Sequence, residues 1–200
     1  VIHVQDLKSK PYIDLTLSVL NAFGWKVQHD HYERFEFLPH PALPAHIEYT
    51  VEGDWSGAAF LLVAGAIAGP ITVKGLQLDS TQADKAVMRA LKDTGASIEI
   101  KEDSILIGPT IDQYGSSIHL NSFEFDATDC PDLFPPLVAL AAQCKGITIL
   151  KGVSRLAHKE SDRGLTLQTE FGKLGIRIEL EDDRMLVYGG TGIHSSEVFS

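Results

Sequence analysis

The 200-residue chain is 44% hydrophobic and 22% charged, which are the proportions of a globular protein able to bury a core. Its formal net charge of -10 disfavours binding to nucleic acid or anionic lipid, and no apolar stretch reaches the ~20 residues that span a bilayer. Two cysteines, Cys130 and Cys144, are too few for a disulfide scaffold, so we expect buried thiols and a cytoplasmic protein.

A helix followed by a hairpin recurs three times along the chain, at residues 10–38, 81–108 and 160–189. Each predicted helix carries apolar residues on one face and ends at a glycine, which is Gly24 in the first copy and Gly175 in the last. Two short strands around a charged turn follow each glycine, which predicts a hairpin with one face in water.

An Ala-rich apolar helix followed by a strand occurs twice, with the helices predicted at residues 54–68 and 134–143. Helices that are apolar nearly all round belong in an interior. The strands that follow end in Lys-Gly pairs that lie roughly 77 residues apart, and the amphipathic helices repeat at nearly the same distance. Both elements therefore belong to one repeat unit.

The repeat predicts an α/β (α+β) fold of βαβαββ units in which sheets lie outside and helices inside. Full units are expected at about residues 51–108 and 124–189, and only the back half of another unit precedes them. The Pro-rich run at residues 40–45 indicates a domain boundary. Because a domain does not begin at half a unit, we expect this chain to lack an N-terminal portion.

Three polar segments at helix starts are candidates for chemistry: S-K-P-Y at residues 9–12, the acidic run that contains Asp132, and K-E-S-D-R at residues 159–163. Each has a plain structural interpretation, respectively a helix start, an N-cap and solvated surface charge. Each also has a functional one, because helix N-termini, hydroxyls and cations bind anions and carboxylates transfer protons. The patterns alone leave both interpretations open.

A metal site is not expected from the one run with suitable ligands, His29-Asp30-His31, because it lies in a predicted hairpin turn with no third ligand nearby in the sequence.

Four motifs, in order, resemble the 5-enolpyruvylshikimate-3-phosphate synthase family: S-K-P-Y-I-D at residues 9–14, V-E-G-D-x-S at residues 51–56, P-D at residues 131–132 and K-E-[ST]-D-R at residues 159–163. The resemblance extends over essentially the whole chain. The family fold, two domains of βαβαββ units with helices inside sheets, agrees with the repeat. The resemblance implies that residues 1–48 finish one domain and that residues 49–200 form two units of the other.

The resemblance further implies transfer of the enolpyruvyl group of phosphoenolpyruvate to the 5-hydroxyl of shikimate 3-phosphate, with release of phosphate and without a metal or organic cofactor. The only partners implied are these two small molecules, and the full-length enzyme is expected to be a monomer. The residues implied to contact shikimate 3-phosphate are Ser9, Tyr12, Asp132 and Lys159. Those implied to contact phosphoenolpyruvate are Glu160 and Arg163. Asp132 is the candidate base and Glu160 the candidate proton shuttle.

Two departures from the family pattern limit these expectations. Arg155 stands where the family commonly has an Asn that contacts shikimate, so its role stays open. Motifs that supply most of the family's cations for phosphoenolpyruvate have no counterpart here, so we expect this chain alone to be nearly inert. The alternatives are the sister enzyme that acts on UDP-N-acetylglucosamine and a non-catalytic repeat or binding module of the same fold.

Overall fold

A computed structural model describes residues 1–39, 46–116, 119–157 and 162–199 of the chain. The α-helices are, in chain order, α1 (Lys10–Ala22), α2 (Trp55–Ala68), α3 (Val87–Asp93), α4 (Phe134–Gln143) and α5 (Arg163–Lys173). Short 3-10 turns also occur in the described residues: η1 (Ala83–Ala86) before α3, η2 (Pro131–Leu133) before α4 and η3 (Val153–Arg155). The strands are β1 (Ile2–His3), β2 (Val27–Asp30), β3 (Arg34–Phe37), β4 (Ile71–Lys74), β5 (Ser97–Ile100), β6 (Ser104–Gly108), β7 (Leu120–Asn121), β8 (Glu124–Asp126), β9 (Cys144–Lys151), β10 (Arg177–Glu181) and β11 (Arg184–Gly189).

The three predicted helix–hairpin copies are confirmed, and each hairpin belongs to a different sheet. The sheets run β1-β3-β2, β4-β6-β5 and β10-β11-β9-β7, and β8 pairs with β9 in parallel. The predicted glycines follow the helices with positive φ, +82° at Gly24 and +87° at Gly175, a backbone region that a side chain disfavours. The sequence therefore ends each helix where the hairpin must turn back.

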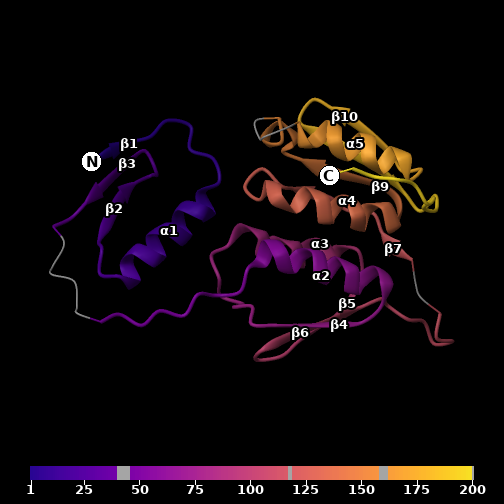
Figure 1. The fold of residues 1–200 in the computed structure, drawn as a ribbon, viewed down its shortest axis with the longest axis horizontal. Helices are drawn as coiled ribbons and strands as arrows, with labels where there is room; N and C mark the ends of the chain where they lie inside the picture. The colour runs from indigo at the N-terminus through magenta and orange to yellow at the C-terminus, as the bar shows by residue number, and fades with distance from the viewer. Residues whose placement is uncertain (40–45, 117–118, 158–161, 200) are drawn as a thin grey trace.

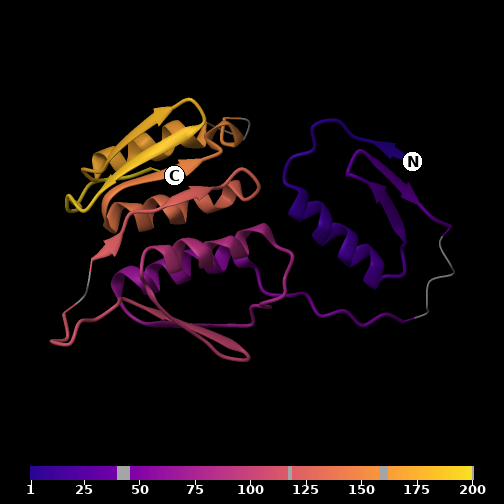
Figure 2. The same ribbon diagram turned by 180° about the vertical axis from the view of Figure 1, so that it is seen from behind.

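The two apolar helices lie between two sheets, as predicted. Figures 1 and 2 show α2, α3 and α4 between the β4–β6 sheet and the strands β9–β11. Helix α2 packs against α4, β4 and β6, while α4 packs against β9 and β11. Cys130 and Cys144 are buried free thiols within this core, as expected.

One predicted strand is wrong. The first full unit was expected to open with a strand near residue 51, yet residues 46–54 contain none. The N–H of Gly53 donates to the carbonyl of Gly75 at 3.2 Å, and no strand ladder extends from that bond. The second unit does open with a strand, β8, which pairs with β9 through residues 124–126.

Apolar surface remains uncovered in both parts of the chain. In residues 1–39, Phe35 is the one buried hydrophobic side chain, and no residue of α1 is buried. Helix α2 leaves Phe60 and Leu61 about half exposed, although it was predicted to be interior on all sides. Helix α4 meets that prediction better, since its exposed face is small.

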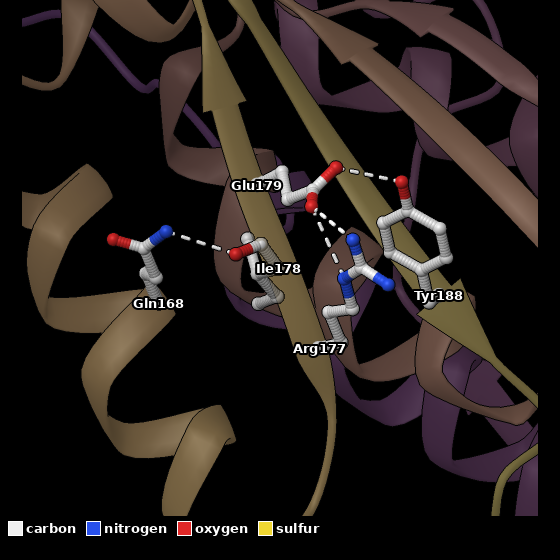
Figure 3. Close-up of polar contacts among 5 residues, drawn as sticks. All are labelled: Gln168, Arg177, Ile178, Glu179 and Tyr188. Carbon is white, nitrogen blue, oxygen red and sulfur yellow. Dashed lines mark hydrogen bonds and ion pairs between the residues drawn. The ribbon is translucent and has the colours of Figure 1, made fainter.

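The outer hairpin of the second unit is joined by polar contacts (Figure 3). The Gln168 side-chain amide of α5 donates to the carbonyl of Ile178 at 2.8 Å, which ties the helix to β10. On the same strand Glu179 accepts from the Tyr188 hydroxyl at 2.6 Å and from the guanidinium of Arg177. The side chains of Arg177 and Glu179 are 67% and 34% exposed, so this ion pair lies at the surface.

The predicted linker at residues 40–45 lies outside the described residues. Within the described ranges, no helix has the length and apolarity needed to cross a membrane.

Candidate functional site

The start of helix α1 meets the body that contains α2–α5. In Figure 1 the N-terminal end of α1 points toward that body, and three side-chain hydrogen bonds join the two. Ser9 and Tyr12, both predicted site residues, make these bonds. The junction therefore brings together segments that are more than 70 residues apart in the sequence.

Ser9 faces two charged groups rather than its own helix. Its backbone N–H donates to Asp129 Oδ1 at 3.0 Å, and its Oγ accepts from Arg155 Nη2 at 2.9 Å. It occupies the N-cap position of α1 with a left-handed backbone, φ 55° and ψ 45°, and makes no side-chain cap hydrogen bond. The helix start predicted for this segment is confirmed, since Ser9 is the N-cap residue and Pro11 lies in the first turn, although the Ser9 hydroxyl bonds Arg155 rather than its own helix.

Tyr12 is bound through its hydroxyl to a buried carboxylate. The phenol donates to Asp84 Oδ2 at 2.5 Å, and only 2% of Asp84 is exposed. Burial, followed by the hydrogen bond to Asp84, raises the pKa of Tyr12 above its ordinary value. Burial also raises the pKa of Asp84, against the lowering effect of the Tyr12 hydrogen bond. Tyr12 is therefore a neutral phenol in a fixed orientation.

Asp132 pairs with Arg163. Arg163 Nη1 lies 3.1 Å from Asp132 Oδ1, and both side chains remain partly accessible, at 37% and 39%. Leu133 rather than Asp132 occupies the N-cap of α4, so the capping interpretation of Asp132 is wrong. The charge of Asp132 contributes to the raised pKa of Tyr12, which puts the two residues in one electrostatic environment.

The remaining two predicted residues, Lys159 and Glu160, lie outside the described residues, so their positions stay predictions. The next residue described, Asp162, caps α5 by accepting from the N–H of Leu165 at 3.1 Å. Arg163 follows it directly as the first residue of the helix.

Sequence reasoning missed two residues of this junction and left a third open. Asp84 was not predicted, Asp129 was included only as part of the acidic run that contains Asp132, and Arg155 was noted only as a departure. One signal for Asp84 was present, because it stands about 78 residues before Asp162, at the same point of the repeat. Nothing in the sequence pattern indicated that Tyr12 would reach it.

Cys130 lies among these acids without taking part in nucleophilic chemistry. Burial, and then the charges of Asp84, Asp129 and Asp126, raise the pKa of its thiol to about 12. A thiol with such a pKa stays protonated at neutral pH, and the thiolate is the nucleophilic form. Cys130 is therefore a packing residue.

The described residues of the junction offer groups suited to anion binding and proton transfer. Arg155 and Arg163 supply guanidinium groups, Ser9 and Tyr12 hydroxyls, and Asp132 an accessible carboxylate. Two hollows of about 170 and 490 Å³ lie between α1 and residues 49–54 and 77–82, but their described linings include none of these five residues. Within the described ranges no three His, Cys, Asp or Glu side chains are grouped closely enough to hold a metal ion.

A family model described as EPSP synthase (3-phosphoshikimate 1-carboxyvinyltransferase) matches residues 1–200. Among curated proteins, the 3-phosphoshikimate 1-carboxyvinyltransferase of Clostridium kluyveri is 34% identical over 195 residues, which are 98% of this chain and 44% of that protein. The enzyme of the same name from Brachyspira hyodysenteriae is 38% identical over 191 residues, with 92% and 42% covered. The chain thus spans about two-fifths of the length of these relatives.

Solved structures show the same fold. The EPSP synthase of Acinetobacter baumannii superposes with a TM-score of 0.71 at 24% identity, covering 90% of this chain and 41% of that one. The enolpyruvyl transferase NikO of Streptomyces tendae superposes with a TM-score of 0.66 at 20% identity, covering 94% and 42%. The predicted α/β architecture is confirmed by these matches.

Proposed function

Because the chain belongs to the EPSP synthase (3-phosphoshikimate 1-carboxyvinyltransferase) family, we propose that the protein containing it transfers the enolpyruvyl group of phosphoenolpyruvate to the 5-hydroxyl of shikimate 3-phosphate. The observation that carries this proposal is the family match over residues 1–200. The junction of Ser9 and Tyr12 with Asp132 and Arg163 supports it, since these motif residues converge from three separate segments.

In the proposed reaction Asp132 removes the proton of the 5-hydroxyl group while the hydroxyl oxygen attacks the substituted carbon of phosphoenolpyruvate. Glu160 delivers a proton to the methylene carbon, which gives a tetrahedral intermediate. This intermediate then loses phosphate together with a proton from the newly formed methyl group, which restores the carbon–carbon double bond of the enolpyruvyl product. Arg163 binds the phosphoenolpyruvate anion. Its 3.1 Å contact with Asp132 supports these roles, because it puts the base beside the cation that would hold the second substrate.

We also propose that residues 1–48 complete one domain and residues 49–200 contribute two units to another. The near absence of buried side chains in residues 1–39 supports this division, as does the separate sheet β1-β3-β2. The half-exposed Phe60 and Leu61 of α2 further indicate a larger domain, because an apolar helix face is normally covered. A protein of this kind would act on small molecules in the cytoplasm, as a monomer.

Phosphate release from phosphoenolpyruvate is the direct test. The full-length protein that carries this segment is expected to release phosphate when shikimate 3-phosphate is the acceptor and not when UDP-N-acetylglucosamine is. The 200-residue chain alone is expected to be inert under the same conditions, since it spans about two-fifths of its relatives. Turnover with the UDP-sugar would favour the sister enzyme.

Binding by the 200-residue chain separates the enzyme from a non-catalytic module. In a titration followed by amide chemical shifts, shikimate 3-phosphate is expected to move the signals of Ser9 and Tyr12, with UDP-N-acetylglucosamine as the control ligand. A full-length protein that releases no phosphate, and whose ligand binding and stability are not lowered by Asp132→Asn or Arg163→Ala, would instead be a protein whose repeats serve only binding or architecture.

A further inference from the structure

Asp84 is the one buried carboxylate at the junction to which no role has been given. Only 2% of it is exposed, and no ion pair within the described residues neutralises it. Its Oδ2 accepts from Tyr12, while its Oδ1 is buried and has no side-chain hydrogen-bond partner among the residues that the structure describes. Burying a carboxylate with so little compensation costs free energy, so its place beside Tyr12 calls for an explanation.

The neighbouring cation does not supply that compensation. Lys85, next in the sequence, directs its ammonium group to the carbonyls of Leu78 and Ser80 at 3.0 and 2.7 Å. Asp84 also caps no helix, because η1 begins without a side-chain cap hydrogen bond. Apart from the backbone N–H of Asp84 itself, the Tyr12 hydroxyl is thus the one group that the described structure directs at this carboxylate.

The direction of that hydrogen bond fixes what Tyr12 can offer a ligand. A phenol has a single proton, and here it is donated to Asp84, so the Tyr12 oxygen has only lone pairs left for other partners. Ser9 is in the opposite situation. Its oxygen accepts from Arg155, and within the described residues no acceptor takes its proton, so Ser9 can donate to a ligand.

We infer that Asp84 is a positioning residue that holds the Tyr12 proton, so that Tyr12 meets the substrate as a hydrogen-bond acceptor while Ser9 meets it as a donor. The inference rests on the proposed function and refines it. A substrate with both hydroxyl groups and a phosphate would then be oriented by polarity, with a hydroxyl at Tyr12 and anionic oxygen at Ser9 and Arg155. Matching donors to acceptors in this way strongly disfavours the reversed orientation of the substrate, because a mismatched group leaves a polar atom without a hydrogen-bond partner.

The first test compares shikimate 3-phosphate with shikimate, which lacks the phosphate, as ligands of the 200-residue chain. Tyr12→Phe is expected to weaken both by a similar factor, about five- to tenfold for one lost hydrogen bond. Ser9→Ala is expected to weaken shikimate 3-phosphate more than shikimate. A Tyr12→Phe loss confined to shikimate 3-phosphate would show that Tyr12 binds the phosphate and would overturn the inference.

A double-mutant cycle asks whether Asp84 acts through Tyr12. Asp84→Leu, a replacement of similar shape without an acceptor, is expected to weaken shikimate 3-phosphate about five- to tenfold in the parent and less than twofold in the Tyr12→Phe background. Asp84→Asn, which can still accept from the phenol, is expected to retain most of the affinity. Equal losses in both backgrounds would mean that Asp84 only supports the fold, and the inference would fall.

A second readout needs no ligand. Tyrosine labelled with carbon-13 at Cζ gives one signal for each of the five tyrosines, and that of Tyr12 is identified by its loss in Tyr12→Phe. Asp84→Leu is expected to shift this signal alone. The matched control is Asp14→Leu, which likewise removes the acceptor and should shift only Tyr32, whose hydroxyl donates to Asp14 Oδ1 at 2.8 Å.

The two readouts separate failure of the inference from failure of the proposed function. If neither ligand binds but the Tyr12 carbon signal moves in Asp84→Leu, the substrate is contradicted while the Tyr12–Asp84 pairing stands. If the signal does not move in a folded Asp84→Leu chain, the inference is wrong whatever the substrate.

Discussion

The two repeat units use equivalent aspartates in opposite ways. In the first unit Asp54 caps α2, and Asp84, at the start of the amphipathic helix, is buried against Tyr12. In the second unit Asp162 caps the amphipathic helix α5, and Asp132, before α4, pairs with Arg163 instead of capping. Each unit therefore has one capping aspartate and one aspartate at the junction, but the two positions have exchanged these roles.

The exchange shows that a repeat position does not by itself fix what a residue does. Tyr12 comes from outside both units and reaches only the first, which gives Asp84 its partner. Arg163 stands where the first unit has Lys85, and it binds a carboxylate where Lys85 binds two backbone carbonyls. The neighbours of each aspartate therefore decide its role, and substitutions at paired positions test this directly.

The largest expected difference is between Asp132 and Asp54, the aspartates before the two apolar helices. In the full-length protein Asp132→Ala is expected to lower kcat for phosphate release by about 10²- to 10⁴-fold, the usual contribution of a general base. Asp54→Ala should leave kcat within about twofold once the variant is folded. Similar kcat values for both variants would contradict the role proposed for Asp132.

The next difference concerns two glycines that follow equivalent strands. A Cβ at Gly152 would lie 2.7 Å from the backbone nitrogen of Thr128, at φ +97°, whereas one at Gly75 would meet nothing within 4 Å, at φ +81°. We expect Gly152→Ala to lower the free energy of unfolding by about 3 kcal/mol and Gly75→Ala by about 1 kcal/mol, because only the first adds a clash to the backbone strain. Urea unfolding of the 200-residue chain measures the unfolding free energy of each variant. Equal decreases would show that the backbone moves to relieve the contact between a Cβ at position 152 and Thr128.

Helix capping gives smaller and nearly equal effects in the two units. Asp54 accepts from the N–H groups of Ser56 and Gly57 at 2.9 and 3.0 Å, and Asp162 accepts from that of Leu165 at 3.1 Å. Replacement of either cap by alanine is expected to cost about 1 kcal/mol of unfolding free energy. The matching Asp84→Ala variant should not follow this pattern, since Asp84 caps nothing.

The smallest expected effect is a pH dependence that separates buried from exposed carboxylates. Burial raises the pKa of Asp84 above its ordinary value of 3.8, so the native state holds this proton more tightly than the unfolded state. Its contribution to stability therefore falls as pH rises from 3.8 through the raised native pKa. The hydrogen bonds from Tyr188 and Arg177 lower the pKa of Glu179, so that its contribution rises with pH (Figure 3).

The measurement for this prediction is the unfolding free energy of Asp84→Asn relative to the parent at several pH values. The unfolding free energy of Asp84→Asn should increase relative to that of the parent as pH rises above 3.8, because the variant lacks the buried charge. In the same comparison, the unfolding free energy of Glu179→Gln should decrease relative to that of the parent as pH rises. A flat difference for Asp84→Asn would mean that the carboxylate is compensated by a group not identified above.

Much of the architecture was predictable because local patterns agree with it. Apolar spacing, terminal glycines and the repeat of about 77 residues placed the helices and hairpins within a few residues of their observed bounds. The missing opening strand of the first unit was the clear failure. Strand pairing depends on a neighbour, and residues 46–54 find no partner beyond the Gly53–Gly75 hydrogen bond, whereas β8 finds β9.

The site was predictable only in part. The motifs identified Ser9, Tyr12, Asp132 and Arg163, and these converge at the junction. Asp84 was not predicted because an isolated aspartate in a helix start is typical of exposed positions. It is buried because η1 packs against α2 and α3 and because Tyr12 donates to its carboxylate. For Lys159 and Glu160 the positions stay predictions, because these residues lie outside the described ranges.

By itself the sequence determined the repeat, the class of fold and the family, since all three follow from residue types and spacings along the chain. The tertiary structure decided which aspartates cap and which face the junction. The same side chain serves either purpose, and the choice depends on groups brought in from distant segments, such as the Tyr12 hydroxyl. Such contacts leave no periodic trace in the sequence, so they emerge only when the start of α1 meets the repeat units.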